Sequence, residues 1–151
     1  MPEVVVTDEF KTWYEALLTD EQQSVFRVVT LLEGRGVSLG YPYSSAIEGS
    51  RHPLRELRVQ HEGRPYRVLY AFDPARKAVL LLGGDKGGND RFYEQAIPRA
   101  EALWERYLAE RSTERAQLRG WAGIGAGSGL PAIMTTAITS GTSRRRAGSI
   151  A

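Results

Sequence analysis

Hydrophobic positions in the first 35 residues indicate a short strand followed by two helices. Residues 4–6 form a β-branched run typical of a strand. Helical spacing then places two apolar stripes along the chain: Phe10, Trp13, Tyr14 and Leu17, followed by Val25, Val28, Val29 and Leu32. Thr7-Asp8 can cap the first helix, and Thr19 with Gln22 has the form of a capping box for the second, which ends near Gly34. We therefore predict a helix hairpin with Trp13 and Tyr14 in its core.

Strand patterns follow a loop-like stretch. Residues 36–53 contain glycines, prolines and a serine pair that interrupt any period, which predicts a loop. Alternating or apolar runs predict strands at 54–60, 64–73 and 77–82, with turns at 61–63 and 73–76. The three strands together predict an antiparallel meander. Tyr66 and Tyr70 share a face with Val68 and Phe72, so we expect both tyrosines in the core.

A last amphipathic helix completes an α+β fold. Asn89 or Asp90 can cap it, Trp104 lies on its apolar side, and the pattern runs to about residue 110. Pro98 falls inside the pattern and predicts a bend or a later start. We assign residues 1–110 to one domain.

The composition changes beyond residue 110. Residues 111–151 hold seven of the sixteen glycines, Ser/Thr clusters and the triple arginine 144–146, and this low complexity predicts a disordered tail. The uncharged run 120–143 is long enough for a membrane span, but it is rich in Gly, Ser and Thr. We therefore favour the disordered tail over the span.

Charge is segregated along the chain, although the formal net charge is only +2. Residues 1–50 carry three basic and eight acidic side chains, and residues 51–91 carry nine basic and five acidic ones. Single-sign patches matter for polyanionic partners because contacts to phosphates are local. The basic strand region is therefore the part of the domain suited to a nucleic acid.

Several kinds of chemistry find no support in the sequence. Cysteine is absent, which excludes thiolate nucleophiles and cysteine-bound metals. His52 and His61 lack the spacing and carboxylate company of a metal site, and the loop 83–88 lacks the Lys-Ser/Thr of a phosphate loop. No serine sits in a nucleophile elbow. We expect no cofactor and no metal and, since no signal peptide is visible, a cytoplasmic location.

The basic strands and their connections instead suit RNA cleavage. RNA carries its own nucleophile, the 2′-hydroxyl, so an enzyme needs only to orient it, move protons and stabilise the charged phosphorane. Arg and Lys supply the electrostatics, and Tyr or His the proton transfer. The residues of suitable type are His52, Arg55, Arg58, Arg64, Arg67, Tyr70, Lys86, Arg91 and Tyr93.

Three segments resemble one family of proteins. They are L-R-E-L-R at 54–58, G-R-P-Y-R-V-L-Y-A-F at 63–72 and L-L-L-G-G-D-K-G-G-N-D-R-F-Y at 80–93. In this order they resemble the RelE/HigB superfamily of bacterial and phage toxins, and its HigB-like branch most, over about residues 3–110. The resemblance implies a RelE-like fold and a type II toxin that cleaves mRNA at the ribosome without metal. It also implies a cognate antitoxin partner with a helix-turn-helix domain, besides the ribosome and mRNA.

The resemblance also assigns roles to residues. Arg67 matches the phosphate-binding arginine, Arg58 a basic residue of the preceding strand, and Lys86 the basic loop. Tyr93 matches the catalytic tyrosine of some members, and His52 stands in for the histidine of others. We expect RNA contacts from three further arginines: Arg55, Arg64 and Arg91.

Two departures weaken the match to the cleavage site. Glu56 and Gly87 replace a lysine and an arginine of RelE-type members. Two other functions therefore stay open: a non-enzymatic, ParE-like inhibitor of DNA gyrase, and an inactive toxin remnant.

Overall fold

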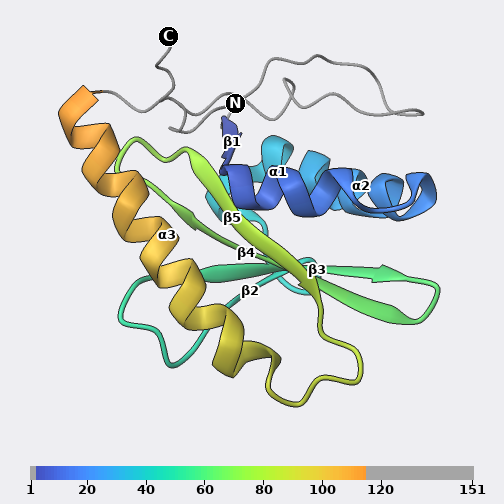
Figure 1. Cartoon of the computed structure of the whole chain (residues 1–151). Helices are drawn as coiled ribbons and strands as arrows, with labels where there is room; N and C mark the ends of the chain where they lie inside the picture. The colour runs from blue at the N-terminus through green and yellow to red at the C-terminus, as the bar shows by residue number, and fades with distance from the viewer. Residues whose placement is uncertain (1–2, 115–151) are drawn as a thin grey trace, which may run out of the picture.

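The computed structural model describes residues 3–114, which form one mixed sheet between helices (Figure 1). The elements in chain order are β1 (Val4–Val6), α1 (Asp8–Glu15), α2 (Thr19–Arg35), the 3₁₀ turn η1 (Gly36–Ser38), β2 (Ser44–Ala46), β3 (Arg55–His61), β4 (Arg64–Phe72), β5 (Ala78–Asp85) and α3 (Phe92–Glu114). The α+β class and the order of helices, strands and last helix are confirmed. The predicted tail and the alternative membrane span lie outside the described residues.

The sheet has the strand order β1-β5-β4-β3-β2. The predicted antiparallel meander is its centre, β3-β4-β5, but the sheet as a whole is mixed and not purely antiparallel. β1 pairs with β5 in parallel, with Val4 opposite Ala78, and β2 adds an antiparallel edge strand inside the predicted loop 36–53. β2 is only three residues long and lacks an alternating apolar pattern, so its sequence carries no strand signal.

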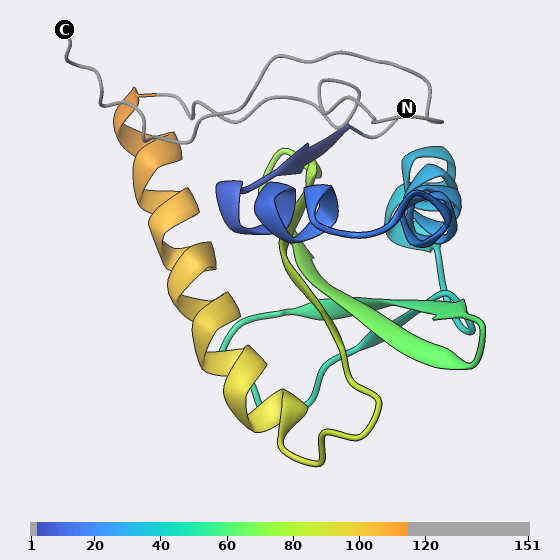
Figure 2. The ribbon, with the colours of Figure 1, turned by 45° about the vertical axis from the view of Figure 1, so that its right-hand side comes forward.

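Each face of the sheet has its own core. α1 and α2 cover one face, where Tyr14, Tyr66 and Tyr70 are buried as expected, and α3 covers part of the other with Trp104 (Figure 2). Trp13, expected in the same core, is only partly buried at its edge. Because β4 alternates between the two faces, Arg67 points away from α1 and α2, whereas its neighbours Tyr66 and Val68 point toward them. The strand pattern thus places Arg67 on the face of the sheet that α3 partly covers.

Turns and caps fix the elements in register. The Thr7 hydroxyl accepts the amide of Phe10 and donates to the carbonyl of Leu81, so the predicted cap of α1 also ties the helix to β5. The β3–β4 turn is a two-residue hairpin with positive φ at Glu62 and Gly63, the combination that a type I′ turn requires.

Three details of the helices differ from the sequence analysis. The cap of α2 is shifted by one residue, since the backbone amide of Leu18 donates to the Glu21 side chain, while Gln22 donates its side-chain amide to the carbonyl of Tyr14. α3 runs without interruption from Phe92 through Pro98, so a later start is wrong. α3 also continues past the predicted end near residue 110 to Glu114, the last residue that the structure describes. No helix among residues 3–114 is long and apolar enough to cross a membrane.

Candidate functional site

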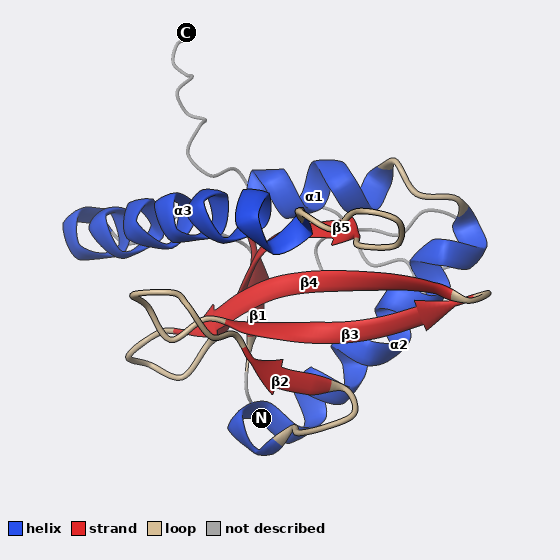
Figure 3. Ribbon diagram, turned by 90° about the horizontal axis from the view of Figure 1, so that it is seen from below, coloured by secondary structure: helices blue, strands red, loops and turns tan. Residues whose placement is uncertain are grey.

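The part of the sheet that α3 leaves open carries the candidate site. Seen from below, β4, β3 and β2 lie in front and α2 passes behind them (Figure 3). On this face, an arginine of β3, an arginine of β4 and a tyrosine of the first turn of α3 surround one carboxylate, and a lysine of the loop after β5 lies against the tyrosine ring. We call these residues the Glu56 cluster: Glu56, Arg58, Arg67, Lys86 and Tyr93.

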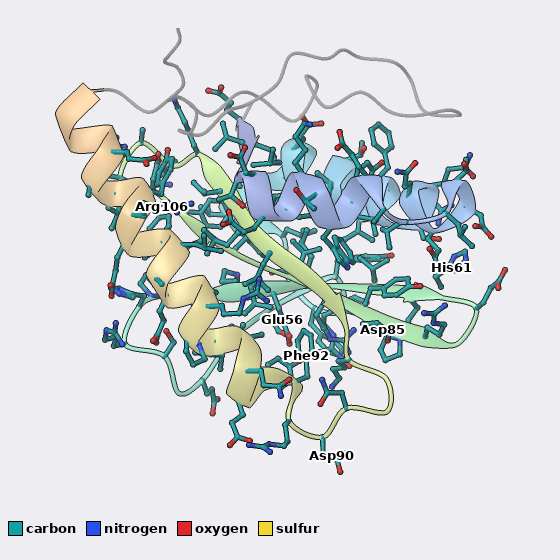
Figure 4. All side chains as sticks on the ribbon, viewed as in Figure 1. Glu56, His61, Asp85, Asp90, Phe92 and Arg106 are labelled. Carbon is teal, nitrogen blue, oxygen red and sulfur yellow. The ribbon has the colours of Figure 1, made fainter. Side chains whose placement is uncertain are left out.

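Glu56 is the centre of the cluster and is almost fully buried. Its Oε1 accepts a 2.6 Å hydrogen bond from the Tyr93 hydroxyl, and its Oε2 accepts one of 3.1 Å from the Ser45 hydroxyl. Arg58 Nη1 lies 3.4 Å from Oε2, and Arg67 Nε lies 3.7 Å from Oε1. Figure 4 labels Glu56 beside Phe92, which opens α3. One carboxylate thus joins β2, β3, β4 and α3.

The strand register explains why an acidic residue stands here. Arg58 and Arg67 are direct partners across β3 and β4, an arrangement in which like charges repel. Glu56 and Arg58 are two apart in one strand and therefore share a face, so Glu56 can neutralise both arginines. Glu56 thus offsets the two positive charges that the strand register places opposite each other.

The two arginines differ in access. The side chain of Arg67 is 5% exposed, and its Nη1 donates to the carbonyl of Tyr66. The side chain of Arg58 is 29% exposed. Arg58 is therefore accessible to a phosphate. Arg67 is not, and its guanidinium lies against the Glu56 carboxylate.

Tyr93 and Lys86 form the other side of the cluster. The Lys86 ammonium lies 5.2 Å from the centre of the Tyr93 ring. Burial, together with the hydrogen bond to Glu56, raises the pKa of Tyr93, so its phenol remains protonated at neutral pH. The pair of Tyr93 and Glu56 therefore combines a proton donor with a proton acceptor at 2.6 Å.

Gly83 and Gly84 belong to β5 and not to a phosphate loop. A Cβ at Gly83 would overlap the Trp13 ring of α1, and one at Gly84 would lie 2.8 Å from the ring of Phe92 in α3. Neighbouring strand residues face opposite ways, so each glycine admits an aromatic ring on its own face. The close approach at Gly84 brings the start of α3, and with it Tyr93, against the sheet.

Four predicted site residues have their contacts elsewhere. His52 Nε2 pairs with Glu105 at 2.8 Å on the outer side of α3. Arg55 donates to Ser44, which lies on the face opposite that of Glu56. Arg64 pairs with Asp85 at 2.9 Å, and Arg91 with Glu94 at 2.9 Å. The structure brings Arg58, Arg67, Lys86 and Tyr93 together and leaves these four apart from the cluster.

The expectation that the histidines lack carboxylate company is wrong. Besides the pair at His52, His61 Nε2 lies 3.4 Å from Asp20 and 3.7 Å from Glu62, and its Nδ1 bonds to Ser24. Asp20, His61 and Glu62 each offer one ligand atom, and these three atoms lie within 4.8 Å of one another, close enough for one metal ion. Both carboxylates are exposed. Packing of α2 on the β3–β4 turn creates this cluster, and the sequence spacing gives no sign of it.

Sequence reasoning missed the central position of Glu56 and its hydrogen bond with Ser45. A usable signal existed for Glu56, since a carboxylate two residues before an arginine on a basic strand lies on the same face. Ser45 could not be assigned to the site because the three residues of β2 carry no strand pattern in the sequence.

Known proteins resemble this chain over the region that holds the cluster. The sequence profile of a family described as "Phage derived protein Gp49-like (DUF891)" matches residues 12–105. "Putative toxin HigB3" of Mycobacterium tuberculosis is 43% identical over 108 residues, which are 70% of this chain and 93% of that protein. "Putative toxin HigB2" of the same organism is 35% identical over 106 residues, which are 68% of this chain but only 53% of that protein. The chain thus spans about half the length of the second relative.

Proposed function

The chain belongs to the family of phage-derived, Gp49-like proteins, and we propose that it is the toxin of a type II toxin–antitoxin pair that cleaves mRNA at the ribosome. The names of the two mycobacterial relatives support the toxin role. The α+β arrangement, with a helix hairpin on one face of the sheet and a last helix on the other, is compatible with a RelE-like fold. The Glu56 cluster is the observation that supports the proposed cleavage activity.

The proposed reaction uses the 2′-hydroxyl of the RNA as nucleophile. Tyr93 takes the proton of this hydroxyl as it passes its own proton to Glu56, along the 2.6 Å hydrogen bond that joins them. The 2′-oxygen attacks the neighbouring phosphate, the bond to the 5′-oxygen breaks, and the leaving oxygen takes a proton from the Lys86 ammonium. The products are a 2′,3′-cyclic phosphate and a 5′-hydroxyl end.

The cations of the cluster have separate tasks in this proposal. Arg58 and Lys86 stabilise the negative charge that builds on the phosphate in the transition state. Arg67, whose buried Nε lies 3.7 Å from Glu56 Oε1, holds that carboxylate in place. His52 has no part in the reaction, and Arg55, Arg64 and Arg91 are left to bind RNA outside the cluster.

Replacing Tyr93 by phenylalanine tests the function. Tyr93→Phe removes one oxygen atom and with it the proton relay, so we expect growth arrest on induction in bacteria to be lost or strongly weakened. Loss of a positioned acid–base group typically slows a reaction about a hundredfold or more. Growth is followed by optical density after induction at matched protein levels.

Tyr107→Phe is the matched control. Tyr107 also lies in α3 and donates a hydrogen bond of 2.8 Å to a carboxylate, that of Asp73, but it is separate from the cluster. We expect the control to arrest growth like the wild type. Equal arrest by Tyr93→Phe would remove the Glu56 cluster from the toxic activity.

A cognate antitoxin is the partner that the toxin role requires. We propose a helix-turn-helix protein encoded beside the toxin, which neutralises it by covering the open face of β3 and β4. Co-expression of the neighbouring gene should abolish the arrest, and the two proteins should purify together.

A further inference from the structure

Tyr41 is an exposed aromatic residue beside the Glu56 cluster. It has a relative exposure of 76%, the highest among the large hydrophobic residues described as exposed. The guanidinium carbon of Arg58 lies 5.2 Å from the centre of its ring. Since Arg58 also pairs with Glu56, one residue separates the tyrosine ring from the centre of the cluster.

The segment that carries Tyr41 is tied to the sheet. The carbonyl of Gly40 accepts the amides of Tyr43 and Ser44, both at 3.0 Å, which closes a turn around Tyr41. The amide of Arg58 then donates to the carbonyl of Tyr43 at 2.8 Å, so this turn is bonded to the middle of β3. These hydrogen bonds therefore fix the backbone that carries the ring relative to β3.

An exposed ring beside a guanidinium has the chemistry of a site for unpaired RNA. Bases of single-stranded RNA stack on aromatic side chains, and arginine next to such a ring binds the connected phosphate. The contact with Arg58 also holds the ring in place by a cation–π interaction. A single exposed ring is common on protein surfaces, so the argument depends on the guanidinium beside this ring and on the cluster next to it.

We propose that Tyr41 is a stacking platform for the mRNA base next to the scissile phosphate, with Arg58 holding the phosphate. The inference rests on the proposed function and adds to it a determinant of cleavage position. Tyr41 positions the substrate and takes no part in proton transfer. Its loss should lower cleavage and blur the base preference at the cut.

The test compares Tyr41→Ala, Tyr41→Phe and Tyr43→Ala with the wild type. Each full-length chain is induced in bacteria at matched levels, and the 5′ ends of cellular RNA are sequenced. Stacking of one base strengthens binding by a factor of about 5 to 150. Cleavage by Tyr41→Ala should therefore decrease by a factor in this range, and its preference for particular bases at the cut should weaken. Tyr41→Phe keeps the ring and should retain both. Tyr43→Ala changes a less exposed ring of the same turn, at 38%, and should behave like the wild type.

Each outcome decides a different point. Unchanged cleavage and unchanged preference in Tyr41→Ala overturn the stacking platform and leave the proposed function standing. Normal cleavage by Tyr41→Ala combined with escape from the antitoxin also overturns it, because the ring would then be a protein contact. Absence of cleavage by the wild type refutes the proposed function, and the platform with it. Thermal melting of the purified variants excludes unfolding as the cause of a loss.

Discussion

Glu56 holds together two arginines that would otherwise repel each other across β3 and β4. Arg67 is the partner that most depends on it, because both side chains are at least 92% buried and Arg67 Nε makes no hydrogen bond. A buried charge that loses its counter-charge destabilises a protein far more than the intact pair stabilises it. The carboxylate therefore matters for stability as well as for the proposed chemistry.

Replacing Glu56 should thus lower the stability of the fold. We expect Glu56→Leu to reduce the free energy of unfolding by about 3–5 kcal/mol, since it leaves Arg67 buried and unpaired. The double variant Glu56→Leu/Arg67→Leu removes both charges and should recover much of this loss. Urea unfolding of the two variants and the wild type measures the difference. A double variant less stable than Glu56→Leu would contradict the pairing.

The glycines of β5 determine how closely the helices approach the sheet. Gly83→Ala and Gly84→Ala place a methyl group against the rings of Trp13 and Phe92, so each should lower the free energy of unfolding by about 1–3 kcal/mol. Gly34→Ala is the control, because it lies in α2 with nothing within 4 Å of the added carbon. It should raise stability by about 0.5–1 kcal/mol, as alanine in a helix generally does. Equal effects at the three positions would contradict the packing.

At the scale of elements, periodicity was sufficient wherever a strand or helix buries its own apolar side chains. The stripes around Phe10 and Val25 predicted α1 and α2, and the alternation of Tyr66 and Tyr70 predicted β4. β2 escaped prediction because its strand character comes from pairing with β3 and not from its own three residues. The parallel pairing of β1 with β5 joins segments some 70 residues apart, a distance over which local patterns carry no information.

At the scale of the whole molecule, a second buried carboxylate joins the helices to the sheet. Glu21 of α2 accepts hydrogen bonds from the Tyr66 hydroxyl of β4 at 2.7 Å and from the amide of Leu18, and Arg64 lies 3.3 Å away. These hydrogen bonds lower the pKa of Glu21, and burial with the bond to Glu21 raises the pKa of Tyr66 to about 12. The ionised carboxylate and the protonated phenol thus stabilise each other.

This network predicts how stability depends on pH. A carboxyl group whose pKa is lower in the folded state stabilises the fold above its unfolded pKa of about 4.3 and loses this contribution as pH falls through the folded value. The melting temperature of the wild type should therefore fall more steeply below about pH 5 than that of Glu21→Gln. Melting curves of both proteins between neutral and acid pH compare the slopes directly. Parallel slopes would show that Glu21 does not stabilise the fold through its charge.

The candidate site was predictable in its residue types but not in its arrangement. Arg58, Arg67, Lys86 and Tyr93 follow from the basic strands and the resemblance, and the structure does bring them together. Glu56, the partner of Arg58, Arg67 and Tyr93, looked like a defect, because a sequence does not reveal that two arginines face each other across a strand pair. The contact of His52 with Glu105 depends on where the loop before β3 meets α3, which local sequence does not specify.

The chemical nature of RNA ends after induction tests the central claim most directly. Cleavage by the 2′-hydroxyl leaves 5′-hydroxyl ends, so the wild type and Tyr107→Phe should produce new 5′-hydroxyl ends within coding sequences, and Tyr93→Phe should produce few or none. Growth arrest by the wild type with intact mRNA would contradict the account and favour a non-enzymatic toxin such as a gyrase inhibitor.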